Sequence, residues 1–174
     1  MKYIIDTNVP KMAGNINAQN ELDAKCSYEC LTFITRLISS NDTIVVLDSP
    51  GEIFREYRNN LSSGGQDTVA TIFFNWVCKN LTRRENSLVE SHYITVTGDR
   101  EYAEFPNSPN LNGFDISDRK FVALANAHPE HPQIVEASDS LWWGFKDALN
   151  DLGIHIYFVC KDYVKTKYEE SHHD

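Results

Sequence analysis

The stretch KYIIDTNVP, Lys2–Pro10, decides the fold class that this sequence predicts. Its first four residues are mostly aromatic or β-branched, which predicts a short buried strand. Asp6 follows at once, and Thr7 and Asn8 break the apolar pattern. An acid in this position is a solvated loop residue, a helix cap or part of a metal site. The choice depends on whether other acids of the chain occupy comparable positions.

Similar apolar runs recur along the chain and alternate with patterns of helical period. This alternation predicts an α/β fold, with a mostly parallel sheet of about five strands and helices on both faces. The continuous apolar character of TIVVL and IYFV is typical of strands buried on both sides. The expected strands are Lys2–Asp6, Thr43–Asp48, His92–Gly98, Gln133–Asp139 and Ile154–Cys160, and the expected helices are Glu21–Ser39, Pro50–Leu61, Asp67–Leu81, Ser117–Ala127 and Leu141–Leu152.

Composition narrows the class of protein. The chain has 174 residues and a formal net charge of -9. We expect one domain over residues 1–160 and a C-terminal helix or tail over 161–174, disordered from Tyr168. The charge excludes a basic nucleic-acid coat, but it suits a cluster of acids that holds divalent metal. Without a signal peptide or an apolar run of about 18 residues, a cytoplasmic protein away from membranes is expected.

Cysteines and loops add smaller expectations. The four cysteines form no CxxC pair, so buried free thiols are favoured over zinc or a disulfide. Residues 62–66, SSGGQ, predict a flexible link, and residues 100–114 predict a long polar loop on the substrate side of the sheet. Of the adjacent Trp142 and Trp143, one is expected to pack inward, because neighbours on a helix cannot share a face.

Three acids end predicted strands, namely Asp6, Asp48 and Asp139. After Asp48, Ser49 and Glu52 match the two ends of a capping box, which gives Glu52 a structural role. Asp48 itself would then brace the turn from strand to helix. Glu56 lies one turn further along the same helix face without a capping role, so it is the preferred functional acid of this segment.

The segment GFDISDRKFVALANA presents a similar choice. Asp115 or Ser117 is the expected helix N-cap, and Asp118 falls in the first turn, where the helix dipole favours a negative charge. The helix leads into the strand that carries Asp139, so Asp6, Glu56, Asp118 and Asp139 would meet at one sheet edge. Crowded carboxylates repel unless cations lie between them, and oxygen ligands select Mg²⁺ or Mn²⁺.

Taken together, IIDTN, EIFREYR, DRKFVALANA and IVEASDS occur in the order and at the spacing of the PIN-domain nucleases, which the chain resembles from Lys2 to about Cys160. The resemblance implies a three-layer α/β/α fold and Mg²⁺- or Mn²⁺-dependent endonuclease activity, most often on single-stranded RNA. The acidic quartet it implies, serving as catalytic residues and metal ligands, is Asp6, Glu56, Asp118 and Asp139. The polar neighbours it implies near metal or substrate are Thr7, Asn8, Ser138 and Ser140.

Arg119 and Lys120 lie beside Asp118, either to meet a scissile phosphate or as solvated charges of the helix face. The resemblance also implies a homodimer and, if the chain is a VapC-type toxin or related defence effector, an inhibitory antitoxin. The chain is longer than compact toxin members, mainly through the 100–114 loop and the HPEHP segment at residues 128–132.

Alternatives to an RNA-cutting enzyme are a nuclease acting on DNA and a catalytically quiet PIN-like module for binding or assembly. A haloacid-dehalogenase-type phosphatase would need an Asp at position 8, where this chain has Asn8.

Overall fold

The protein is an α/β/α sandwich around a five-stranded parallel sheet of order β3-β2-β1-β6-β7. The computed structural model describes residues 1–15, 17–62 and 68–172. The sheet strands are β1 (Lys2–Ile5), β2 (Ile44–Asp48), β3 (Val89–His92), β6 (Gln133–Glu136) and β7 (Ile156–Phe158). The helices are α1 (Asn8–Ala13), α2 (Glu21–Ser39), α3 (Glu52–Leu61), α4 (Val69–Leu81), α5 (Arg119–Ala127), α6 (Leu141–Asp151) and α7 (Lys161–Ser171). The expected fold class is confirmed.

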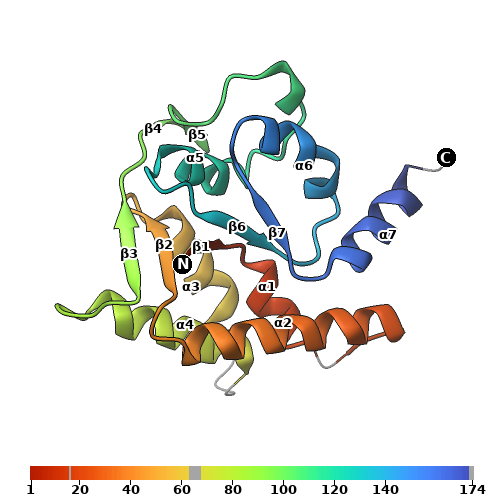
Figure 1. Ribbon diagram of the computed structural model, residues 1–174, viewed down its shortest axis with the longest axis horizontal. Coiled ribbons are helices and arrows are strands. Elements are labelled where there is room, and N and C mark those ends of the chain that lie inside the picture. Colours follow the sequence, from red (N-terminus) through yellow and green to blue (C-terminus); the bar gives the residue numbers. More distant parts are fainter. Residues whose placement is uncertain (16, 63–67, 173–174) are drawn as a thin grey trace.

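The helices separate into two layers (Figure 1). Helices α1, α2 and α4 pack together below the sheet in this view, whereas α5 and α6 lie above it. The chain leaves β1 toward β2 and β3, and it later returns to the other side of β1 with β6. The order of the strands therefore reverses between β1 and β6. In open parallel sheets this switch point, at the carboxyl ends of the strands, is where ligands bind.

Apolar side chains of the central strands fill the space between the layers. Ile4 and Ile5 of β1 and Ile134 and Val135 of β6 are fully buried. Strands covered on both faces need such continuous apolar runs, which explains why these segments lack the alternation of a half-exposed strand. The core is thus densest around β1, beside the switch point.

Several elements begin or end at residues other than those expected. Strand β6 ends at Glu136, three residues before the expected Asp139. The third sheet strand is Val89–His92, whereas Val96–Gly98 (β4) pairs outside the sheet with Glu101–Tyr102 (β5). The segment ahead of the expected strand takes the place beside β2 because Val89 buries its side chain there, while all of β4 is exposed.

The turn from β2 to α3 differs from the expected capping box. Helix α3 begins at Glu52, and Gly51 before it has φ +81, a conformation that costs glycine little. The carboxylate of Asp48 accepts hydrogen bonds from the backbone N–H groups of Glu52 (2.7 Å) and Ile53 (2.8 Å). The capping box of Ser49 and Glu52 is therefore wrong, and Asp48 supplies the acceptor because its strand ends directly below the helix.

The cysteines are not all free thiols. Cys26 of α2 and Cys160, which precedes α7, form a disulfide across 134 positions of sequence. Cys30 lies beside it, with its sulfur 3.5 Å from Sγ of Cys160, and Cys78 is free. The expectation of free thiols is thus wrong for Cys26 and Cys160. The spacing of the cysteines along the chain could not predict this pair, because the fold is what brings α2 and the β7–α7 junction together.

Residues 63–66 of the expected link, and 173–174 of the expected tail, lie outside the described residues. Helix α7 continues to Ser171, so the segment from Tyr168 to that point is helical rather than disordered. The 100–114 loop contains β5 and the 3₁₀ helix η1 (Pro109–Leu111). Among the described helices, none is both long and apolar enough to cross a bilayer.

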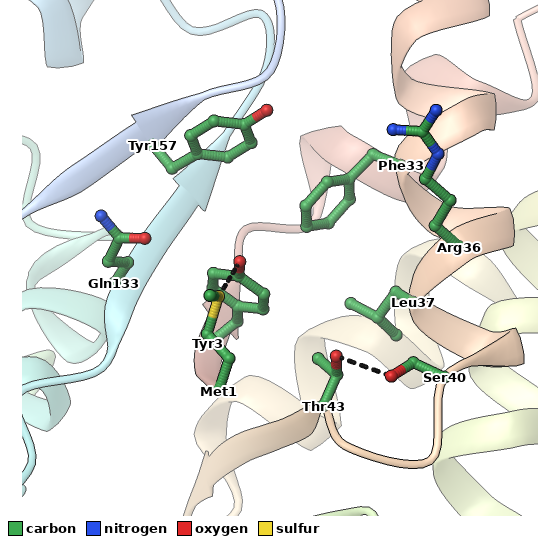
Figure 2. A pocket seen from close by; sticks show the side chains of 9 residues that line it. All are labelled: Met1, Tyr3, Phe33, Arg36, Leu37, Ser40, Thr43, Gln133 and Tyr157. Carbon is green, nitrogen blue, oxygen red and sulfur yellow. Dashed lines mark hydrogen bonds between the residues drawn. The ribbon is translucent and has the colours of Figure 1, made fainter.

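A pocket of about 460 Å³ opens between α2 and the sheet, near the amino ends of β1 and β6 (Figure 2). Aromatic rings of Tyr3, Phe33 and Tyr157 face it, and Arg36 extends beside it. No carboxylate lines this pocket, and it lies at the opposite end of the sheet from the acids at the switch point. Although it is larger than the pocket beside those acids, it offers no carboxylate to bind a metal ion.

Candidate metal centre at the switch point

The centre of the site is a pair of carboxylates on adjacent strands. The register pairs Ile5 of β1 with Val135 of β6, so the next residues on the two strands are Asp6 and Glu136. The N–H of Asp6 continues the ladder by donating to the carbonyl of Val135 at 2.9 Å. Asp6 is 2% exposed and Glu136 is 0% exposed. Two acids are thus held side by side within the core.

Burial and mutual repulsion act on this pair. Burial raises the pKa of Asp6 well above its usual range, and the nearby carboxylates of Glu136, Asp118 and Glu56 raise it further. Burial likewise raises the pKa of Glu136 to about 8, although backbone N–H groups oppose the shift. A pair of this kind needs a shared proton or a cation to be stable.

Glu136 was missed by reasoning from sequence. One of its oxygens, Oε1, accepts the backbone N–H groups of Ser138 (3.0 Å) and Asp139 (2.8 Å). The other, Oε2, is buried and has no hydrogen-bond partner within residues 1–15, 17–62 and 68–172. The signal was available, because Glu136 follows the apolar run QIV just as Asp6 follows YII. Extending the expected strand to Asp139 hid it.

Asp118 approaches the pair from α5. It occupies the N-cap position of this helix but makes no side-chain capping hydrogen bond there, so capping does not account for it. Its Oδ2 accepts the indole N–H of Trp142 at 3.1 Å. Burial raises the pKa of Asp118 to about 6, against the opposing charge of Lys120. Trp142 is the buried member of the tryptophan pair, as expected for one of the two, and it holds this carboxylate in place.

Asp139 lies at the edge of the cluster. Its Oδ1 accepts the N–H of Leu141 at 2.9 Å, so it helps to start α6. Burial raises its pKa, and its charge in turn raises the pKa of Asp118 and of Glu136. Strand β6 was expected to end at Asp139, but it ends at Glu136. Asp139 follows three residues later.

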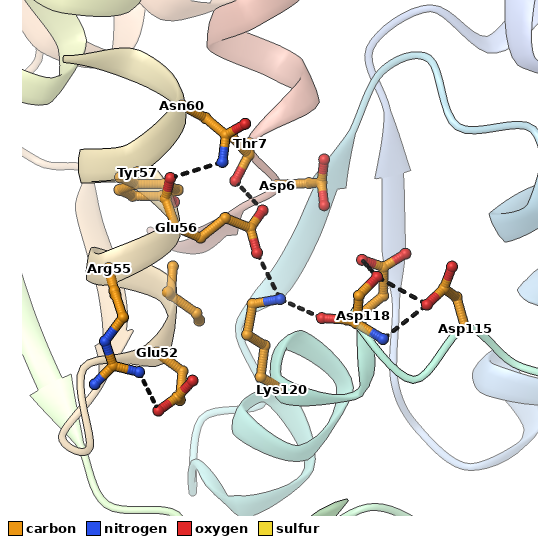
Figure 3. Close-up of polar contacts among 12 residues, drawn as sticks. Asp6, Thr7, Glu52, Arg55, Glu56, Tyr57, Asn60, Asp115, Asp118 and Lys120 are labelled. Carbon is orange, nitrogen blue, oxygen red and sulfur yellow. Dashed lines mark hydrogen bonds and ion pairs between the residues drawn. The ribbon is translucent and has the colours of Figure 1, made fainter. Parts of the chain in front are cut away.

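Glu56 is brought to the same site but is bound by protein groups (Figure 3). Its Oε1 accepts the hydroxyl of Thr7, and its Oε2 lies 2.6 Å from the ammonium of Lys120. Lys120 is only 5% exposed and also donates to the carbonyl of Ser117. The interpretation of Lys120 as a solvated surface charge is therefore wrong.

The acids with undecided roles are structural. Asp48 accepts two helix N–H groups, as described above. Glu52 pairs with Arg55 at 2.5 Å on the surface of α3. Asp115 accepts the N–H and the hydroxyl of Ser117, which lowers its pKa. These contacts leave the cluster itself to Asp6, Asp118, Glu136 and Glu56, with Asp139 beside it.

The expected polar neighbours are placed as follows. The N–H of Asn8 donates to Asp6 at 2.7 Å, which fixes that carboxylate. Ser138 contributes a backbone N–H to Glu136, and Ser140 precedes α6 without a side-chain capping bond. The guanidinium of Arg119 stacks over the ring of Phe105 at 5.0 Å, and its buried Nε has no partner. Arg119 is therefore engaged in packing on the 100–114 loop.

The donor set fits a hard divalent cation in its chemistry. It consists of carboxylate oxygens, one of them buried and without a partner, in a position where a positive charge would relieve repulsion. Over the described part of the chain, however, no three carboxylates bring oxygens within 4.8 Å of one another; only Cys26, Cys30 and Cys160 meet that criterion. Mg²⁺ commonly takes only one or two carboxylates and completes its shell with water.

A pocket of about 210 Å³ opens beside the cluster, lined by Glu56 and Lys120 together with side chains of α3 and the β4–β5 turn. It brings cationic and amide groups next to the acids. Its other lining residues are Glu52, Arg55, Asn59, Asn60, Arg100, Tyr102 and Ser117.

Comparison of the chain with family models, with curated proteins and with solved structures finds no match.

Proposed function

We propose that this protein is a metal-dependent endonuclease that hydrolyses phosphodiester bonds in RNA, with the active site at the switch point between β1 and β6. The observation that carries the proposal is the buried pair of Asp6 and Glu136, which forms no ion pair with any described residue and whose Glu136 Oε2 has no hydrogen-bond partner among those residues. Phosphodiester hydrolysis builds negative charge on the phosphate, which carboxylates alone would repel. A divalent cation held by this pair would neutralise that charge.

Asp6 and Glu136 are the proposed direct ligands, with Asp118 and Asp139 acting through water. A bound Mg²⁺ or Mn²⁺ would lower the pKa of a water molecule and neutralise charge on the phosphate. The chain's own groups orient the site: the N–H of Asn8 holds Asp6, the indole of Trp142 holds Asp118, and two loop N–H groups hold Glu136. Because these carboxylates are already held in place, they need little rearrangement when a cation binds.

The pocket beside the cluster supports a polyanionic substrate. Arg55 and Arg100 line it, although the protein as a whole carries a net charge of -9. Cations gathered next to buried acids can bind backbone phosphates on either side of the scissile bond. The same features suit single-stranded DNA, so the choice of RNA is part of the test.

The test is cleavage of end-labelled single-stranded RNA and DNA in Mn²⁺, repeated in EDTA and with Asp6→Asn. We expect cleavage of RNA in Mn²⁺, at least a hundredfold loss with the variant, and none in EDTA. Asp147→Asn is the matched control, because its carboxylate is exposed on α6 and the variant should retain full activity. Cleavage that is equal in all conditions would refute the proposal.

A second candidate is a quiet module that binds nucleic acid or a protein without cutting it. The contact that favours it is Lys120, whose ammonium already neutralises Glu56. Under this candidate, RNA would be retained in a binding assay without being cleaved in Mn²⁺ or Mg²⁺, and Asp6→Asn would leave that binding unchanged.

We place the proposed activity in the cytoplasm, where RNA substrates are found. If the chain is a toxin or defence effector, its expression should arrest growth, and Asp6→Asn should relieve the arrest. An inhibitory protein partner and a homodimer are expected under that interpretation.

A further inference from the structure

Lys120 is an unusual component of a site built from acids. It lies in the first turn of α5, at 5% exposure, with Nζ 2.6 Å from Glu56 Oε2. The same ammonium donates to the carbonyl of Ser117 and lies 4.5 Å from the centre of the Phe121 ring. A buried ammonium is costly unless its donors are satisfied, and here a carboxylate, a carbonyl and an aromatic face satisfy it.

The position of this charge matters as much as its burial. The Nζ of Lys120 contacts Glu56, and Asp118 precedes Lys120 by two positions at the start of α5. Figure 3 shows the ammonium of Lys120 between Glu56 and the start of α5, which carries Asp118. On the other side, Asp6 and Glu136 lie on adjacent strands and form no ion pair with any described residue, and Glu136 Oε2 has no hydrogen-bond partner among those residues.

We propose that Lys120 replaces a second metal ion, so that the site binds one divalent cation at Asp6 and Glu136, with Asp118 acting through water. Glu56 then serves as the carboxylate that holds Lys120 rather than as a metal ligand. This inference rests on the proposed function, because it specifies the metal content of that same site. It assigns to Lys120 a positioning role through Glu56 and a fixed positive charge beside the metal.

Two physical reasons oppose a second ion while Lys120 is present. A divalent cation between Glu56 and Asp118 would meet the ammonium at close range in a poorly solvated place, where repulsion is strong. Moving the ammonium away would also break its contacts to Glu56 and to the Ser117 carbonyl. Removal of the amine leaves two carboxylates without a counter-charge, which is the condition that attracts a cation.

The experiment is a titration with Mn²⁺, followed by electron paramagnetic resonance of the free ion, on the wild type and three variants. We expect one bound ion per chain in the wild type and two in Lys120→Met, the second binding more weakly. Lys120→Arg keeps the charge and should bind one. Lys165→Met removes an exposed lysine of α7 and is the matched control, also with one ion.

The outcomes separate this inference from the proposed function. Two ions in a wild type that cleaves RNA would overturn the inference and leave the nuclease intact. One ion in both the wild type and a folded Lys120→Met would overturn it as well. A wild type that binds no Mn²⁺ and cuts no RNA would overturn the proposed function, and the inference with it. Circular dichroism checks that Lys120→Met is folded, and the wild-type count decides if it is not.

Discussion

Replacing Glu136 with glutamine should make the protein more stable while abolishing its metal binding. Glu136→Gln keeps an oxygen for the two loop N–H groups that Oε1 now accepts, and it places a neutral NH₂ at the orphaned Oε2 position. The substitution therefore removes the charge and leaves the shape. Sites adapted to bind a ligand commonly sacrifice stability in this way.

The size of the gain follows from the pKa of Glu136, which burial raises from 4.5 to about 8. An acid with a raised pKa in the folded state contributes most to stability at low pH, and the contribution is lost as pH rises from 4.5 to about 8. At pH 7.5 this loss amounts to about 4 kcal/mol. The amide has its own desolvation cost, so we expect a net gain of about 2–4 kcal/mol.

Thermal unfolding in EDTA measures this gain. For a chain of this size, about 2–4 kcal/mol corresponds to a Tm that is roughly 5–15 °C higher at pH 7.5. At pH 5 the gain in the free energy of unfolding should fall below about 1 kcal/mol. At that pH the Glu136 carboxyl is partly protonated in the unfolded chain too, so its raised pKa in the folded state costs little. Added Mn²⁺ should raise the Tm of the wild type and leave that of the variant unchanged.

Glu85→Gln is the matched control, because Glu85 is exposed and its substitution should leave Tm within about 1 °C at both pH values. A Glu136→Gln variant that is no more stable than the wild type at pH 7.5 would refute the reasoning. So would an equal gain at pH 5, since a gain without pH dependence cannot come from the carboxylate.

Three other perturbations test separate parts of the structure. Trp142→Phe keeps an aromatic ring in the core but removes the N–H that Asp118 accepts. We expect calorimetric titration to show a Mn²⁺ affinity that is roughly threefold to tenfold lower, a loss of about 1 kcal/mol. An unchanged affinity would show that the hydrogen bond does not position the carboxylate. Asp48→Ala leaves two N–H groups of α3 without their acceptor and should cost about 1–2 kcal/mol in urea unfolding, with a cost near zero contradicting its capping role. Cys26→Ser removes the crosslink to Cys160 and should lower the free energy of unfolding by about 2–4 kcal/mol. The wild type should lose the same amount of stability when a reductant is added. A wild type whose stability does not change in reductant would contradict a disulfide.

Local patterns determined the layout of the chain. The apolar runs before Asp6, Asp48 and Glu136 are buried strands, and the helical periods between them are helices, because period and apolar content follow from burial on one or two faces. Strand order was not available from such patterns. It depends on crossovers between distant segments, and it brings β6 beside β1.

The candidate site divides along the same line. The sequence by itself determined that acids follow several strands, which singled out Asp6, and that a helix beginning near Asp118 leads into the strand of Gln133. Only the tertiary structure decided that Glu136 faces Asp6, that Lys120 neutralises Glu56, and that Cys26 meets Cys160. The physical reason is that periodicity reports which face of an element is buried, whereas charge pairing depends on which elements the fold places in contact.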